Sequence, residues 1–202
     1  MTLPVSVIPF PGFIPHHTCA GANSAGNIPD PDIQVHPANM LTAFELAGFV
    51  AAHAVWCVSD TDGLVPMAAF GTDDGQRRLE RLVFDDSGVA VEHGRKLLES
   101  APFSASDGVL AYDGRIAIPE GKKLDAIILE TRTYAFPWAK AAIAVAYTPK
   151  STGNFRVHKP KLVLWDKCDD FDMGAAIESF FNGIASHEQG AKVWNDALDE
   201  SR

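Results

Sequence analysis

The chain has 202 residues and a formal net charge of −9 at pH 7, with 47% hydrophobic and 21% charged residues. This is the composition of an ordinary globular domain, and it excludes collagen-like, disulfide-dense and largely disordered chains. The first basic residue is Arg77, so the acidity belongs to the front of the chain. Such a charge argues against a general binder of nucleic acids or anionic membranes, and we expect a protein partner or self-association instead.

Residues 1–38 contain seven of the 13 prolines. Because proline lacks the backbone donor that helices and central strands need, we predict an extended arm over 1–38 and one domain over 39–202. The prolines also interrupt the N-terminal apolar stretch, so we expect no secretory leader and a cytoplasmic location. The apolar residues of the arm need cover from their own domain or from a second subunit: Val5, Val7, Ile8, Phe10, Phe13 and Ile14.

The first helix is predicted from a capping box, in which Thr42 and Glu45 satisfy the first backbone amides. Its apolar face extends to His53, which we interpret as a hydrogen-bonded core histidine. The apolar run Ala54–Val58 is too short for a further helix and predicts a strand. Two more strands, over 64–70 and 76–84, would complete an antiparallel meander.

A second helix is expected over 87–99, and Asp113-Gly114 predicts the turn of a hairpin formed by residues 109–112 and 115–118. Two C-terminal helices are expected to begin after Asp172 and Ser186. Since the strands cluster instead of alternating with helices, we predict an α+β domain. Its mostly antiparallel sheet of about seven to eight strands is packed by the N-terminal, middle and two C-terminal helices. The later strands are expected over residues 124–134, 141–147 and 155–165.

The strongest chemical candidate is Asp113, followed 17 residues later by Glu130 and, two positions on, by Arg132. This pattern resembles the metal-binding segment of the PD-(D/E)xK nuclease superfamily, over about 20 residues. The resemblance implies a divalent cation held by the two acids and a phosphodiester hydrolase. The chain has Arg where that superfamily has Lys, and Arg does not give up its proton. We favour the alternative, a Glu130–Arg132 pair at the end of a central strand.

Two further groups of residues are candidates for binding. The expected meander would bring four carboxylates to one rim, where they could bind Ca²⁺ or a basic partner, although aspartates also serve as turn and cap residues. These four are Asp60, Asp62, Asp85 and Asp86. A small-molecule pocket could lie between the sheet and the C-terminal helices, near Trp165, His187 and Trp194.

We find no phosphate-binding loop, nucleophile elbow or paired CxxC motif in the sequence. We therefore expect an acidic, non-catalytic interaction protein that self-associates through its N-terminal arm, with no cofactor. The alternatives are the hydrolase, with a divalent cation, and the small-molecule binder.

Overall fold

The computed structural model describes residues 7–9, 40–61, 63–117 and 123–199. These residues form four α-helices and one sheet in which every pairing except β7–β9 is antiparallel. The predicted α+β domain with a mostly antiparallel sheet is thereby confirmed. The sheet has nine strands, one or two more than expected, because two very short strands pair at its two ends.

The strands follow the order β1-β3-β2-β4-β5-β6-β7-β9, and β8 pairs with β6 outside this path. Both β7 and β8 lie on the side of β6 away from β5, each against a different part of that strand. The bounds are β1 Val7–Pro9, β2 Met67–Gly71, β3 Arg77–Arg81, β4 Asp107–Ala117, β5 Lys123–Thr133, β6 Lys140–Thr148, β7 Arg156–His158, β8 Lys161–Asp166 and β9 Leu198–Asp199.

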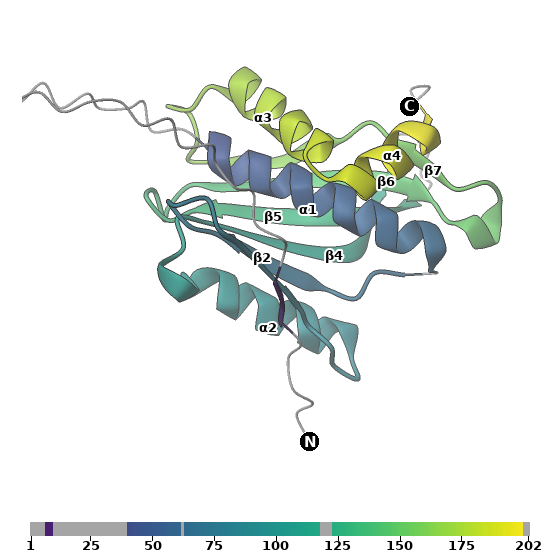
Figure 1. The fold of residues 1–202 in the computed structure, drawn as a ribbon, viewed down its shortest axis with the longest axis horizontal. Helices are drawn as coiled ribbons and strands as arrows, with labels where there is room; N and C mark the ends of the chain where they lie inside the picture. Colours follow the sequence, from purple (N-terminus) through teal and green to yellow (C-terminus); the bar gives the residue numbers. More distant parts are fainter. Residues whose placement is uncertain (1–6, 10–39, 62, 118–122, 200–202) are drawn as a thin grey trace, which may run out of the picture.

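Helix α1 spans Leu41–Asp60 without a break, so the predicted strand Ala54–Val58 is wrong. The cause is burial on nearly every side: α1 lies between the sheet and the C-terminal helices (Figure 1), and such a helix has no polar face from which its period can be read. The capping box is wrong too, since Met40 precedes the helix and no side chain caps it. Glu45 instead accepts a hydrogen bond from Arg77 at 2.7 Å.

By length and composition α1 could cross a membrane, because its 20 residues have a mean hydropathy of 1.6 in the most apolar window. In the fold, 61% of that window is buried. A long apolar helix packed inside a domain has the same composition as a membrane span.

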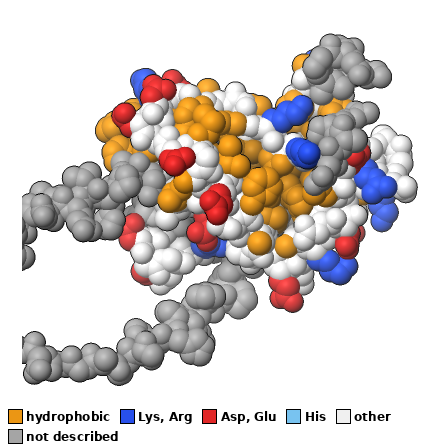
Figure 2. Space-filling view, turned by 90° about the horizontal axis from the view of Figure 1, so that it is seen from above, with side chains coloured by type: hydrophobic (Ala, Val, Ile, Leu, Met, Phe, Trp, Pro, Cys, Tyr) orange, Lys and Arg blue, Asp and Glu red, His pale blue; other side chains and the backbone are white. Residues whose placement is uncertain are grey.

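The helices form two layers on opposite faces of the sheet (Figure 1). Helices α3 (Met173–Ala185) and α4 (Glu188–Ala197) pack on α1, which packs on β4 and β5. Helix α2 (Ser87–Glu99) covers the other face over β2 and β4, where a second, smaller apolar cluster forms. From above, hydrophobic side chains gather in the centre of the α3/α4 side (Figure 2).

The predicted hairpin around Asp113-Gly114 is wrong, because β4 runs through both residues and pairs with β5 along its whole length. Gly114 serves close packing and not a turn, since a Cβ there would lie 2.9 Å from Cγ1 of Ile128. The strand expected over 155–165 is divided into β7 and β8. Most of the arm predicted over 1–38 lies outside the described residues; its β1 pairs with β3 of the same chain.

Candidate functional site

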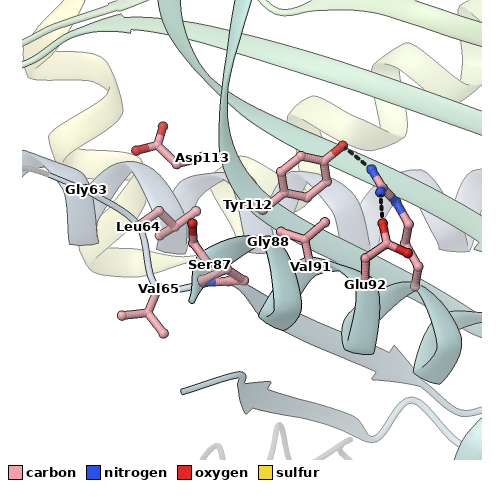
Figure 3. Close-up of a pocket in the computed structure, with 11 residues that line it drawn as sticks. Gly63, Leu64, Val65, Ser87, Gly88, Val91, Glu92, Tyr112 and Asp113 are labelled. Atoms are coloured by element: carbon pink, nitrogen blue, oxygen red, sulfur yellow. Dashed lines mark hydrogen bonds and ion pairs between the residues drawn. The ribbon is translucent and has the colours of Figure 1, made fainter. Parts of the chain in front are cut away.

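A cavity of about 680 Å³ opens where β4 extends beyond its neighbour β2. The pairing of β2 with β4 begins at Met67 and Ala111, so the following part of β4 has no strand on that side among the described residues. The segment leading into β2 and the first turns of α2 fill the gap only in part (Figure 3). The lining residues are Gly63, Leu64, Val65, Pro66, Ser87, Gly88, Val91, Glu92, Arg95, Tyr112 and Asp113.

Helix α2 is fixed at the cavity by local and tertiary contacts. Asp86 caps it, because its Oδ1 accepts a hydrogen bond from the backbone N–H of Val89 at 2.9 Å. Gly94 lies over the sheet, where an added Cβ would meet the methyl groups of Leu82 and Leu110. The cap sets where the helix begins, and the glycine allows it to approach the sheet closely.

A charged cluster joins α2 to the sheet beside the cavity. Arg95 donates from Nε and Nη2 to Oε1 of Glu130 at 2.9 and 2.8 Å, and from Nη1 to Glu92 at 2.5 Å. The Tyr112 hydroxyl donates to the same Oε1 at 2.9 Å. It accepts from Arg95 at 3.1 Å (Figure 3). Burial, and then the charge of Glu130, raise the pKa of Tyr112. Two carboxylates therefore neutralise the single guanidinium.

Asp113 lies apart from this cluster, at the other end of the cavity (Figure 3). Its Oδ1 accepts a hydrogen bond from the Tyr147 hydroxyl at 2.9 Å. Partial burial raises the pKa of the Asp113 carboxyl, while the hydrogen bonds from Tyr147 and the Leu64 backbone lower it. This carboxylate is held in place by neutral donors and forms no ion pair with a basic residue in the described part of the chain.

The cavity has an excess of negative charge. Glu92 and Asp113 line it, and Arg95, the one basic residue in the described lining, is already paired with carboxylates. Three of the predicted rim aspartates lie one to three residues before a lining segment along the chain: Asp60, Asp85 and Asp86. Asp62 lies outside the described residues, and no group of three or more His, Cys, Asp or Glu in the described part of the chain could hold a metal ion.

The structure does not bring the three nuclease-like residues together. Glu130 pairs in register with Leu110, and Arg132 with Gly108, so both side chains lie on the α2 face of the sheet. Asp113 pairs with Ile127 and lies on the α1 face. Glu130 also takes Arg95 as its partner, and not Arg132, which donates to the backbone oxygen of Thr131 at 3.0 Å. Asp113 and Glu130 therefore cannot hold one cation between them, because their side chains lie on opposite faces of the sheet.

The three proposed pocket residues pack in different places along α1. Trp165 lies edge-on to Phe44 in the first turn, with ring centroids 5.8 Å apart. His187 contacts His53, nine residues further along the helix, which is about 13 Å along its axis. Trp194 is buried in the core. These side chains support packing between the sheet and the helices, and the cavity lies elsewhere.

A histidine pair joins α1 to the start of α4. The backbone N–H of Gly190 donates to Nδ1 of His187 at 3.0 Å, which assigns the proton of that ring to Nε2. His187 Nε2 then donates to Nδ1 of His53 at 3.0 Å. Burial lowers the pKa of both rings, that of His53 to about 4. The place of His53 on the inner helix face was readable from the sequence, but its partner, 134 residues away, was not.

Comparison with protein-family models, curated proteins and solved structures finds no match to this chain.

Proposed function

We propose that this protein is a non-catalytic interaction domain whose acidic cavity binds a basic group of a partner protein. One observation carries the proposal: an open cavity of about 680 Å³ has two carboxylates in its wall and, among its described lining residues, a single, already neutralised cation. A cavity of this volume lies within the roughly 300 to 1,000 Å³ range of binding pockets.

The chemistry of the wall suits the side chain of Lys or Arg. Such a side chain has an apolar stem and a charged end, and it binds best where both are matched. Leu64, Pro66 and Val91 provide apolar surface, whereas Glu92 and Asp113 provide negative charge. The aspartates that precede the lining segments add a negative field that attracts a basic partner from solution.

The test is an NMR titration of the ¹⁵N-labelled protein with a short peptide of alternating Gly and Arg. A peptide of alternating Gly and Gln is the neutral control. We expect the basic peptide to shift the amide signals of Ser87, Val91 and Tyr112, and its binding to weaken as salt rises. No shift at these amides with the basic peptide, or equal shifts with the neutral one, would overturn the proposal.

A pair of variants separates the cavity from the general charge of the protein. Asp113→Asn removes a carboxylate from the wall, while Asp196→Asn removes one from the exposed side of α4. We expect the first change to weaken binding about tenfold and the second to leave it within about twofold. Equal effects would assign the binding to net charge alone.

The expected self-association through the arm remains a prediction, since most of that segment lies outside the described residues. Sedimentation of a chain lacking residues 1–36 tests it, because loss of the arm would then lower the oligomeric mass.

A further inference from the structure

Strand β8 forms an edge of the sheet, on the side of the molecule opposite to β1. Among the described strands it pairs only with β6. Ala142 pairs with Leu164 and the next residue of β6, Ile143, pairs with Leu162, so Val163 is an extra residue and forms a β-bulge. A strand edge with unused backbone donors and acceptors is a template for pairing with another strand.

Apolar side chains surround this edge on both faces of the sheet. Val163 and Leu164 of β8 are exposed. Above the strand, α3 carries an exposed apolar stripe with a spacing of four residues, made by Met173, Ile177 and Phe181. A small apolar cavity lies between β8 and α3, and the hydrophobic centre of this side of the molecule is visible in Figure 2. Clustered exposed apolar residues of this kind mark an interaction surface.

We propose that β8 pairs antiparallel with β8 of a second copy of this chain around a twofold axis, which makes one continuous sheet across the dimer. The inference goes beyond the acidic cavity, because it uses a different edge of the sheet. The axis would pass between Val163 and Leu164. Each Val163 then lies opposite Leu164 of the other copy, and the exposed stripe of α3 lies beside its symmetry mate.

The charges of β8 are self-complementary in this register. The strand begins with Lys161 and ends with Asp166, both exposed. Around the proposed axis each Lys161 lies opposite Asp166 of the other copy, so the twofold forms two ion pairs. Opposite charges directly across a strand pair stabilise it, and like charges destabilise it. This complementarity selects a second copy as the partner of the edge.

The bulge makes the same register consistent with the faces of the sheet. Residues directly opposite in an antiparallel pair point to the same face, and a slip of one residue reverses this. Leu162 and Trp165 would lie on opposite faces of a regular strand. Here both lie on the α1 side, where Leu162 lines the small cavity with Phe44 and Trp165 packs on the same ring. The proposed axis places Leu162 opposite Trp165 of the other copy, and both side chains then lie on the α1 side of the sheet.

The decisive experiment is sedimentation velocity of two charge variants, separately and mixed. In the homodimer of Lys161→Glu, each of the two contacts between positions 161 and 166 joins two acids. In the homodimer of Asp166→Lys, each of these contacts joins two lysines. In the mixed dimer both contacts again join opposite charges. We expect wild type to sediment at twice the chain mass of 21.8 kDa, each variant alone to dimerise about tenfold more weakly, and the mixture to regain the affinity.

A second pair of variants tests the apolar contact without altering the core. Val163 and Val83 are exposed to 51% and 53%, and Val83 lies outside β8. We expect Val163→Lys to be monomeric and Val83→Lys to remain dimeric. A monomeric wild type would overturn the proposal. So would a dimer that persists in Val163→Lys but dissociates without residues 1–36, since the arm would then be the interface.

Discussion

The sharpest test of the fold is a single added methyl group at Gly48, where α1 crosses α3. A Cβ atom there would overlap the backbone oxygen of Phe180 and lie 2.8 Å from its carbonyl carbon. Because these atoms belong to the backbone of a helix, they cannot rotate away as a side chain would. Helix α3 must therefore move away from α1 by roughly 1 to 2 Å to restore van der Waals separation.

The cost follows from what α3 buries. Phe180 and Ile184 are almost fully buried against α1, and burial of two such side chains contributes about 5 kcal/mol. A gap of this size loses up to about half of the contact energy, and the strain of overpacking adds about 2 kcal/mol. Replacing a helical glycine by alanine returns about 1 kcal/mol of helix propensity. We expect Gly48→Ala to lower the free energy of unfolding by about 3 kcal/mol.

Urea denaturation followed by circular dichroism measures this change, and the thermal midpoint should fall by about 6 to 12 °C. Gly94→Ala in α2 is the matched control, since its Cβ would meet only the ends of leucine side chains. Those side chains can change rotamer, so we expect a loss of at most about 1 kcal/mol. If Gly48→Ala unfolds within about 0.5 kcal/mol of wild type, or if Gly94→Ala loses as much, the close helix crossing is refuted.

Three other measurements address the remaining contacts. Burial holds the pKa of His53 at about 4, below the 6.5 of the unfolded chain, so the stability it carries is present above pH 6.5 and lost as the pH falls toward 4. Urea denaturation between pH 6.5 and pH 4 should show about 2 kcal/mol less loss of unfolding free energy in His53→Gln than in wild type. The same pH dependence in both proteins would contradict the assignment. Arg95→Met should lower the free energy of unfolding by about 2 kcal/mol, because Glu130, whose side chain is only 17% exposed, would lose its cation. Thermal melts should show a loss of less than about 0.5 kcal/mol of unfolding free energy for Arg115→Met, because the Arg115 side chain is 70% exposed. Equal losses in the two arginine variants would argue against the charged cluster of Arg95. Asp86→Ala should cost about 1 kcal/mol by removing the cap of α2, and unaltered hydrogen exchange in that helix would exclude the cap.

Elements with local signals were predictable from the sequence. Helix α2 was expected over residues 87–99 and occupies that range, because one of its faces is apolar and polar residues cover the other. Strands β5 and β6 were also expected within one residue of their observed bounds, although seven consecutive residues of β6 are buried. In α2 the pattern of apolar residues has the period of the structure that forms.

Two features that depend on distant neighbours were not predictable from the local pattern. The segment Ala54–Val58 of α1 was expected as a strand because it is a short, uninterrupted apolar run, and only α3 and α4 supply the cover that makes it part of a helix. Gly114 was expected in a turn, although it lies in β4 to admit the side chain of Ile128. A local pattern does not distinguish such roles, since the deciding neighbour is distant in the sequence.

The candidate site shows the same division. The residue types around the cavity and their negative charge follow from the sequence, which also left a cap open as a role of the rim aspartates, the role that Asp86 has. Strand register and the packing of α2 decide that Glu130 pairs with Arg95 and that Asp113 lies on the opposite face of the sheet. The sequence by itself determined composition, charge, fold class and the helices with one polar face. Only the tertiary structure decided which charges meet, because those partners lie tens of residues apart and come together through the burial of apolar surface.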